Sequence, residues 1–269
     1  MAETRFGVVG CGGRMGRALV AELIGAGGRV AAGSEVAGSP HLGKDLGELA
    51  GVAPLGIKAS GDPAAVFAAS DVVLDFTLPA ASTVHAKLAA ETGRALLLGT
   101  TGLDEAQGAA VRAAAKRAPV LWAANFSLGV NLLLSLVEDA ARRLGEDYDI
   151  EVLEMHHRHK VDAPSGTALV LGEAAARGRG IDLKARSQRV RDGHTGPRKP
   201  GDIGFATLRG GDVAGEHSVI FAAAGERLEL THRATTRLVF ARGAVHAAKW
   251  LAGKGPGLYD MKDVLDLRK

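Results

Sequence analysis

A strand that ends in a glycine-rich turn and opens a helix constrains the fold of this chain more than any other feature. The run Arg5–Val9 is β-branched and aromatic, and the glycine-rich segment 10–16 (GCGGRMG) follows it. Apolar residues at helical spacing occupy positions 18–24, after which further glycines provide a stop. Because glycine allows sharp turns and close backbone approach, the segment predicts a tight strand–turn–helix unit.

Strand and helix continue to alternate through the first half. Apolar runs predict strands at 29–32, 72–76, 95–98 and 120–123. Ala-rich segments at 80–91 and 105–117 predict helices between them. This order is typical of a parallel sheet covered by helices on both faces, and therefore of an α/β fold with a Rossmann-type parallel-sheet dinucleotide-binding domain.

The pattern changes after about Asn125. Helices are predicted at 130–144, 167–177 and 237–251, and strands at 150–155, 203–208, 217–222 and 227–231. Glycines join the last three strands, which predicts antiparallel hairpins. We expect residues 1–126 and 237–269 to form the dinucleotide-binding domain. Residues 127–236 are expected to form an α+β substrate-binding and oligomerisation domain with a mixed, largely antiparallel sheet.

The loop Gln188–Gly201 is rich in Gly, Pro and Arg and long enough to be functional or mobile. His194 and Arg198 are compatible with a lid. Whether the loop closes over a substrate stays open at this point.

The glycine turn also predicts a binding site. Its backbone N–H groups and the helix start favour a pyrophosphate. Gly10, Gly12 and Gly16 form G-x-G-x-x-x-G, one residue longer than the usual fingerprint, and Glu35 stands about 20 positions further on, where an acid binds the ribose. The structural alternative is a tight turn alone. Cys11 is interpreted as a small side chain in a crowded loop rather than a nucleophile.

The segment Glu154–Thr167 carries a cationic cluster, defined here as His156, His157, Arg158, His159 and Lys160. In an extended strand, His156, Arg158 and Lys160 share a face. Ser165 or Thr167 then caps a helix whose backbone donors suit a carboxylate. The alternatives are a solvated basic patch and a metal site through His157 and His159. We favour a dianionic small substrate with an acid catalyst, and we expect no metal.

Composition narrows the class of protein. The chain has 269 residues, of which 46% are apolar and 23% charged, and its net charge is +3. This balance disfavours a nucleic-acid partner. Its single cysteine excludes an internal disulfide, and no apolar run approaches the roughly 20 residues of a membrane span. We expect a cytoplasmic protein.

At this point the chain resembles the dihydrodipicolinate reductase family over almost its whole length. The resemblance rests on the segment 154–168, which contains HHRHK followed by DAPSGTA. Supporting motifs are GGRMG at 12–16, DFT at 75–77, GTTG at 99–102, AANFS at 123–127 and GHTG at 193–196.

The resemblance implies reduction of 4-hydroxy-tetrahydrodipicolinate to tetrahydrodipicolinate with loss of water, in diaminopimelate and lysine biosynthesis. It implies NADH or NADPH as cofactor, a substrate held between the domains, and a homotetramer assembled through the second domain's sheet. The implied cofactor-binding residues are Gly10, Cys11, Gly12, Gly13, Arg14, Met15, Glu35, Gly99, Thr100, Thr101, Ala123, Ala124, Asn125 and Phe126. The implied catalytic residues are His156 and Lys160, and the implied substrate-binding residues are His157, Gly166 and Thr167.

Two positions depart from the family pattern. Val36 follows the ribose acid and Leu78 follows Phe-Thr, where many members have an arginine that meets the 2′-phosphate of NADPH. We therefore expect NADH to be used at least as well as NADPH. Arg14 and Lys44 are the residues that could compensate.

Two other functions remain compatible with the dinucleotide-binding pattern. One is another two-domain dehydrogenase of a small amino or hydroxy acid, which inhibition by pyridine-2,6-dicarboxylate distinguishes. The other is a non-catalytic regulator that binds NAD(P)H, which cofactor consumption in the presence of substrate distinguishes.

Overall fold

The computed structural model describes residues 3–268, which form two compact units. The first unit contains the chain up to Leu128 together with the chain from Leu238 onward. The second unit contains Gly129–Arg237. The first unit is therefore built from two separate stretches of sequence.

The first unit is built on a six-stranded parallel sheet, as the sequence predicts. Its strand order is β11–β5–β4–β3–β1–β2. The strands are β1 (Arg5–Val9), β2 (Arg29–Ser34), β3 (Val72–Asp75), β4 (Ala95–Leu98), β5 (Pro119–Trp122) and β11 (Gly257–Tyr259). The helices are α1 (Arg14–Gly25), α2 (Leu46–Ala50), α3 (Pro63–Ala69), α4 (Pro79–Thr92), α5 (Glu105–Ala114), α9 (Leu238–Leu251) and α10 (Met261–Val264).

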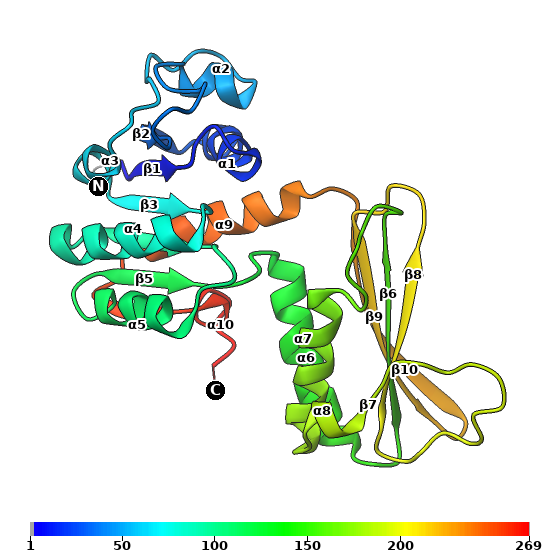
Figure 1. The fold of residues 1–269 in the computed structure, drawn as a ribbon. Coiled ribbons are helices and arrows are strands. Elements are labelled where there is room, and N and C mark those ends of the chain that lie inside the picture. The colour runs from blue at the N-terminus through cyan, green and yellow to red at the C-terminus, as the bar shows by residue number, and fades with distance from the viewer. Residues whose placement is uncertain (1–2, 269) are drawn as a thin grey trace. The chain divides into compact units, whose positions relative to one another are not determined.

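Both faces of this sheet are buried at its centre because the central strands are continuous apolar runs. On β4, Leu97 packs into the core shared with α1 and α9, whereas Leu96 and Leu98 pack into the core shared with α3, α4 and α5. Successive side chains of a strand point to opposite faces, so a continuous apolar run feeds two cores. Figure 1 shows α4 and α5 in front of the sheet and α9 behind it.

The strand order places a topological switch point at β1. From β1 the chain runs through α1 to β2 on one side, and later continues in β3 on the other side. Loops that leave neighbouring strands in opposite directions open a crevice at the carboxyl ends of a parallel sheet, and ligands bind there. The glycine turn 10–13 follows β1 at this edge.

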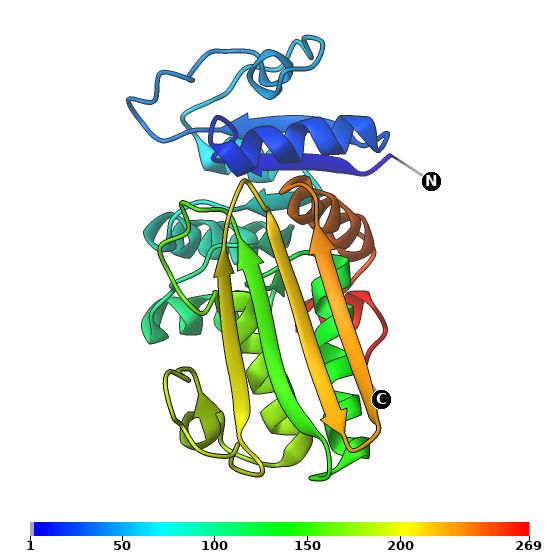
Figure 2. The ribbon, with the colours of Figure 1, turned by 90° about the vertical axis from the view of Figure 1, so that its right-hand side faces the viewer.

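The second unit is a five-stranded mixed sheet with helices on one face. Its strand order is β10–β9–β6–β8–β7. The strands are β6 (Asp149–His156), β7 (Ser187–Gln188), β8 (Ile203–Arg209), β9 (Gly215–Ala223) and β10 (Glu226–Ala234). The helices are α6 (Leu128–Leu144), α7 (Gly166–Arg179) and α8 (Leu183–Arg186). Figure 2 shows the sheet in front of α6 and α7, and apolar side chains of β6, β8 and β9 pack against these helices.

One strand pairing differs from the sequence-based prediction. β9 and β10 form the expected antiparallel hairpin, but β8 does not pair with β9. Instead β6 lies between them, parallel to β8 and antiparallel to β9. Residues 210–214 therefore cross over the end of β6. Five residues reach up to about 17 Å, which covers the roughly 10 Å between strands two places apart.

The loop 188–201 is held at one end of the second unit's sheet. Arg191 and Arg198 both form ion pairs with Glu151, and Arg198 also binds Asp149. These acids lie at the beginning of β6, whereas His156 lies at its end. In this structure the loop is thus anchored away from His156, which does not support the lid that His194 and Arg198 suggested.

Gly16 offers a test of the close packing between α1 and the glycine turn. A Cβ at Gly16 would lie 2.1 Å from the carbonyl oxygen of Gly10, whereas a Cβ at Gly25 of the same helix would meet nothing within 4 Å. We expect Gly16→Ala to lower the free energy of unfolding by about 1–3 kcal/mol, as overpacking does. The matched variant Gly25→Ala should be neutral or stabilising, by up to about 1 kcal/mol. Urea denaturation of both variants measures this, and equal effects would contradict it.

Candidate functional site

The glycine turn forms a backbone cradle at the start of α1. Gly10 has a positive φ of 69°, and its N–H donates to the carbonyl of Ser34 (2.8 Å). Within the described chain no side chain caps α1, whose first turn contains no acidic residue. The uncapped N–H groups and the helix dipole favour an anion there.

The glycines of the cradle have no room for side chains. A Cβ at Gly10 would lie 2.7 Å from Thr77 Cγ2, and one at Gly12 would lie 2.5 Å from the ring of His41. The close approach of backbone and neighbours is what a pyrophosphate cradle requires. These residues therefore fit the phosphates of a dinucleotide.

Glu35 lies beside the cradle, directly after β2. Its Oε1 accepts the N–H of Gly12 at 2.6 Å. Arg17 donates from Nε to the carbonyl of Gly12 (2.7 Å) and from Nη2 to Nε2 of His41 (3.1 Å). Arg17 is thus used in holding the turn. Val36 is 74% exposed and offers no cation beside the acid.

Cys11 is buried in the turn and is chemically quiet. Its exposed fraction is 1%, and burial, followed by the nearby charge of Glu35, raises the pKa of its thiol to about 12. Because the thiolate is the nucleophilic form, the interpretation of Cys11 as a small structural side chain agrees with its environment.

Asp75 ends β3 and ties the neighbouring loops together. It is fully buried, and its Oδ2 accepts Nδ1–H of His85 on α4 at 2.8 Å. Its Oδ1 accepts the backbone N–H (2.9 Å) and the hydroxyl (2.6 Å) of Thr77. Thr100, in the loop after β4, lies 3.4 Å from the same oxygen and accepts a hydrogen bond from Ser82.

These contacts keep Asp75 ionised. Burial by itself would raise the pKa of the carboxyl group, but the hydrogen bonds from His85 and Thr77 outweigh burial and hold its pKa below the ordinary value. The charged group therefore fixes the loops after β3 and β4.

The structure places the predicted nicotinamide-side residues at this same edge of the sheet. Gly99 follows β4, and a Cβ there would lie 2.1 Å from the ring of Phe76. Phe76 in turn packs against Phe126 with ring centroids 5.2 Å apart. The segments 99–101 and 123–126 follow β4 and β5, so all predicted cofactor residues lie at the carboxyl ends of strands.

In the second unit the cationic cluster follows β6, beneath the connection 210–214. The N–H of His157 donates to the carbonyl of Val213 (2.8 Å) and that of Arg158 to Gly211 (3.2 Å). Gly210 N–H donates to the carbonyl of His156 at 3.0 Å. Because β6 ends at His156, the side-chain alternation expected from His156 to Lys160 does not extend to Lys160.

Glu154 is the centre of a buried polar network on the helix-covered face of β6. It is 1% exposed, and its Oε2 lies 2.6 Å from Nδ1 of His156. Arg209 at the end of β8 donates to both carboxylate oxygens, at 2.8 and 2.9 Å. The N–H of Ser165 donates to Oε1 at 3.0 Å.

Ser165 caps α7, which resolves the choice between Ser165 and Thr167. Its Oγ accepts the N–H of Ala168 (3.2 Å) and lies 3.1 Å from Nε2 of His217 on β9. Burial, followed by the nearby His156, lowers the pKa of His217 to about 4, so this ring is neutral at pH 7. The helix then begins at Gly166, where a Cβ would meet nothing within 4 Å.

The other cationic residues have separate partners. Lys160 Nζ donates to Asp162 Oδ1 at 2.7 Å. Arg237 Nη2 lies 2.7 Å from Nε2 of His157. Since arginine only donates, His157 accepts on Nε2 and carries its proton on Nδ1. Burial, followed by the charge of Arg237, lowers the pKa of His157.

Several of these residues were assigned no role in the sequence analysis. They are Asp75, His85, Glu154, Arg209, His217 and Arg237. One signal was available for His217, because it shares the inward parity of Val219 and Phe221 on β9. A histidine in an apolar alternation points to a polar partner inside. Arg209 carries no such signal, since its partner Glu154 lies 55 residues away in the sequence.

The structure also bears on the other classes of site. Among residues 3–268, no group of three or more His, Cys, Asp or Glu is arranged to hold a metal ion. No helix in the same range is long and apolar enough to cross a membrane.

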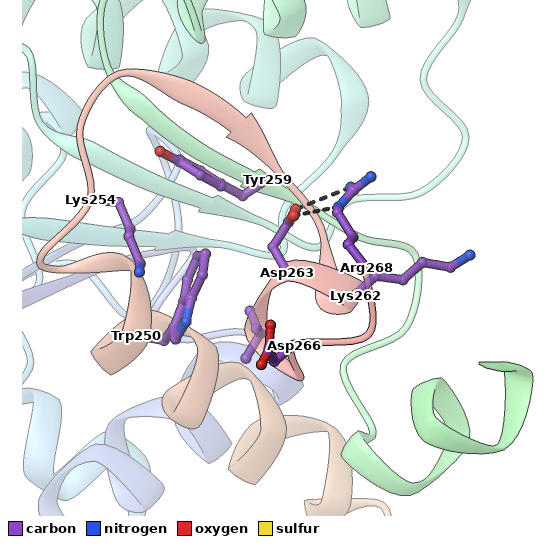
Figure 3. A pocket seen from close by; sticks show the side chains of 8 residues that line it. Trp250, Lys254, Tyr259, Lys262, Asp263, Asp266 and Arg268 are labelled. Atoms are coloured by element: carbon purple, nitrogen blue, oxygen red, sulfur yellow. Dashed lines mark hydrogen bonds and ion pairs between the residues drawn. The ribbon is translucent and has the colours of Figure 1, made fainter. Parts of the chain in front are cut away.

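A pocket of about 480 Å³ lies on α9, β11 and α10, away from every predicted site residue. Figure 3 shows its lining, in which Asp263 is paired with Arg268. Lys254 Nζ lies 4.1 Å from the ring centroid of Trp250, in a cation–π contact. Asp263, Arg268 and Lys254 thus have partners within the lining, and we assign this pocket no part in the site.

Comparison with known proteins follows the division of the chain. Residues 4–126 match the family model described as dihydrodipicolinate reductase, N-terminus, and residues 129–265 match the model for the C-terminus of the same enzyme. The chain belongs to the dihydrodipicolinate reductase family. Its members are pyridine-nucleotide-dependent oxidoreductases, and so is this chain.

Individual relatives agree with this membership. The 4-hydroxy-tetrahydrodipicolinate reductase of Brucella abortus (strain 2308) is 58% identical over 262 residues, which is 97% of this chain and 98% of the relative. That of Afipia carboxidovorans is 54% identical over 268 residues, 99% of this chain and 98% of the relative. Both alignments extend over essentially the full length.

Solved structures share the fold. The dipicolinate-bound dihydrodipicolinate reductase of Paenisporosarcina sp. TG-14 has a TM-score of 0.77 at 22% identity, with 96% of this chain and 98% of that chain covered. An amine dehydrogenase from Mycobacterium smegmatis has a TM-score of 0.60 at 15% identity, covering 96% and 94%. The architecture is therefore also found in another dehydrogenase.

The buried pair of Asp75 and His85 gives a stability prediction. Asp75→Asn should lower the free energy of unfolding by about 3 kcal/mol at pH 7, as breaking a buried pair does. The matched variant Glu105→Gln removes a carboxylate that is 92% exposed and paired with Arg112, so it should cost no more than about 1 kcal/mol.

The pH dependence of the Asp75 effect has a defined sign. Because the folded-state pKa of Asp75 is depressed, its contribution is present above the unfolded value of about 3.9 and is lost as the pH falls through the folded value. The difference between wild type and Asp75→Asn should therefore shrink below about pH 4 in urea titrations. A constant difference across that range would argue against an ionised Asp75.

Proposed function

We propose that this chain reduces 4-hydroxy-tetrahydrodipicolinate to tetrahydrodipicolinate with loss of water, using NADH or NADPH, in diaminopimelate and lysine biosynthesis. The observation that supports it best is His156, whose Nδ1 lies 2.6 Å from the buried carboxylate of Glu154 in a cationic cluster beside the start of α7. The full-length relatives carry this enzyme's name.

We assign dinucleotide binding to the first unit and substrate binding to the second. The cradle 10–15 would hold the pyrophosphate through backbone donors, and Glu35 the ribose hydroxyls. The segments 99–101 and 123–126 would line the nicotinamide side. When bound, the reduced nicotinamide supplies a hydride.

The second unit offers matched charge for a dicarboxylate. The start of α7 at Gly166 and Thr167 has no acidic residue in its first turn, which suits one carboxylate. His157, held by Arg237, and the remaining cations of the cluster suit the other carboxylate. Together these groups would orient a six-membered ring with two carboxylates.

His156 and Lys160 supply the proton. Loss of the C4 hydroxyl as water, together with a proton from C5, leaves an unsaturated imine in the ring. Hydride addition then forms a C–H bond at C4, the electron pair moves to the ring nitrogen, and an N–H bond forms with a proton from the protein. Tautomerisation, in which C5 gains a proton and the nitrogen loses one, gives tetrahydrodipicolinate. His156 Nε2 is the donor that its Glu154 contact leaves available, since Nδ1 faces the carboxylate. Lys160 stabilises the developing charge or delivers the second proton.

We further propose a homotetramer. Helices α6 and α7 lie on one face of the second unit's sheet, and the opposite face carries Leu153, Leu208 and Ile220 at its centre. Leu208 is 48% exposed. An apolar sheet face is stabilised when another copy covers it, which light scattering of the purified protein tests.

The activity is tested with substrate generated in the assay from pyruvate and aspartate semialdehyde. We expect NADH or NADPH to be consumed only when the enzyme that condenses pyruvate with aspartate semialdehyde is also present. We expect pyridine-2,6-dicarboxylate to inhibit competitively with the cyclic substrate. Cofactor binding without turnover would favour a regulator. Turnover of a different small acid, insensitive to this inhibitor, would favour another dehydrogenase.

Replacement of His156 tests its role. His156→Ala should lower kcat by about 100- to 10,000-fold, the range for loss of a general acid, while the Kd for NADH, measured by fluorescence, stays unchanged. His246→Ala, an exposed histidine on α9, is the matched control and should keep wild-type kcat. Full activity of His156→Ala would remove this residue from the mechanism.

The expected preference for NADH follows from Val36 and Leu78, which stand where many family members have an arginine. We expect kcat/KM with NADH to be at least equal to that with NADPH, because Val36 and Leu78 are both 74% exposed and uncharged and Arg17 is held by Gly12 and His41. Val36→Arg should raise the NADPH-to-NADH ratio about tenfold, the value of one charged hydrogen bond.

Val190→Arg is the control for that substitution, since Val190 is 73% exposed in the second unit. It should leave the ratio unchanged. A strong NADPH preference of the wild type would instead assign the 2′-phosphate to Arg14 or Lys44.

A further inference from the structure

Glu154 is a buried carboxylate of the second unit, and both of its oxygens accept hydrogen bonds from several partners. Arg209 on β8 binds both of its oxygens, the N–H of Ser165 binds Oε1, and His156 binds Oε2. These partners come from three different segments of the chain. A buried carboxylate is tolerated only with such full hydrogen bonding.

The network keeps Glu154 in its ionised form. Burial raises the pKa of a carboxyl group, but the hydrogen bonds from Arg209, His156 and the Ser165 N–H outweigh burial, so the pKa of Glu154 lies below its ordinary value. An ionised carboxylate can only accept hydrogen bonds. The 2.6 Å contact therefore requires that Nδ1 of His156 carries a proton.

This requirement fixes which ring nitrogen can exchange a proton. With Nδ1–H donated to Glu154, Nε2 is the remaining site of His156. Gly215 on β9 approaches it closely, because a Cβ at Gly215 would lie 3.0 Å from Nε2, and glycine leaves that atom out. The ring of His217 stands edge-on to His156 with centroids 5.1 Å apart, which fixes its plane from the β9 side.

The same carboxylate also fixes the helix start opposite. Oε1 of Glu154 binds the N–H of Ser165, the N-cap of α7, and α7 begins at the next residue, Gly166. One side chain thus sets the distance between the imidazole of His156 and the first turn of α7. A shift of Glu154 would move both groups.

We infer that Glu154 is a positioning residue for the reduction: it keeps a proton on Nδ1 of His156, so that the imidazolium donates from Nε2 and the neutral ring is the Nδ1–H tautomer, and it aligns that ring with the start of α7, where a carboxylate would bind. This inference rests on the proposed function of His156. During each turnover the proton leaves Nε2, His156 becomes neutral with Nδ1–H retained, and a proton from solvent restores Nε2–H. Glu154 stays ionised throughout and stabilises the imidazolium.

The charges facing His156 come from each neighbouring element. Glu154 and Arg209 lie on the sheet, His217 faces it from β9, and Lys160 with its partner Asp162 lies in the segment after β6. Glu154 is the one that contacts the ring nitrogen directly. Its replacement should therefore act on the tautomer, whereas replacement of the others should not.

The first test is the tautomer of His156, read from ¹⁵N chemical shifts of histidine-labelled protein, with the signal assigned by its loss in His156→Ala. In the wild type the neutral ring should be protonated on Nδ1. A neutral His156 protonated on Nε2 would overturn the inference without any change at position 154, so this measurement holds even if variants of Glu154 fail to fold.

The second test is Glu154→Gln, which keeps the shape and removes the charge. We expect a shift of the neutral His156 ring toward the Nε2–H tautomer and a fall in kcat of at least about 100-fold, because the carboxylate no longer stabilises the imidazolium that donates from Nε2. The Kd for NADH should stay at the wild-type value. Wild-type tautomer populations in Glu154→Gln would overturn the inference.

Arg209→Lys is the matched control for a merely structural role. It breaks the bidentate bond to Glu154 but keeps the positive charge and the contact between Glu154 and His156. It should lower stability while the tautomer of His156 stays as in the wild type. The same tautomer change in Arg209→Lys and Glu154→Gln would show that loosening of the network, rather than the carboxylate, sets the ring.

The outcomes separate this inference from the proposed function. If His156→Ala keeps full kcat, the proposed donor role fails, whatever the tautomer. If His156→Ala loses activity but Glu154→Gln keeps both kcat and the Nδ1–H tautomer, the donor role stands and the positioning role of Glu154 fails.

Discussion

A carboxylate buried where a central strand ends holds the functional loops of each unit. In the first unit Asp75 at the end of β3 binds His85 and Thr77, and in the second Glu154 near the end of β6 binds Arg209 and His156. A buried charge is stable only while its donors remain in place. The loops that carry these donors therefore cannot move independently, and the geometry at both strand ends depends on electrostatics as much as on apolar packing.

The two units present positive potential in different ways. The glycine turn of the first unit uses backbone N–H groups and a helix start. The side chain of Arg17 beside it binds the carbonyl of Gly12 and the ring of His41. The second unit gathers cationic side chains around a strand end and adds the start of α7. Backbone donors suit a cofactor bound in one fixed orientation, whereas titratable side chains suit a ligand whose charge changes during reaction.

The sequence predicted five of the six strands of the parallel sheet because each of the five is a short, largely apolar run next to a helical pattern, as in Val72–Asp75 and α4. It did not predict β11, which is only three residues long and begins with glycine. It failed where pairing is non-local: the insertion of β6 between β8 and β9 leaves no mark on the spacing of residues 203–222. Motif residues such as Gly10 and His156 were identifiable, since their chemistry is local. Arg209 was not identifiable, and inward parity was the one signal for His217, because the roles of both arise only when distant strands lie side by side.

The first unit's core is completed by a helix from the far end of the chain. Residues of α9, including Ala244, Ala248 and Leu251, are fully buried against α1 and the parallel sheet. During synthesis on the ribosome, α9 therefore emerges only after the whole second unit, and until then α1 alone covers that face of the sheet. The nascent first unit keeps apolar surface exposed through that interval, which favours aggregation over folding.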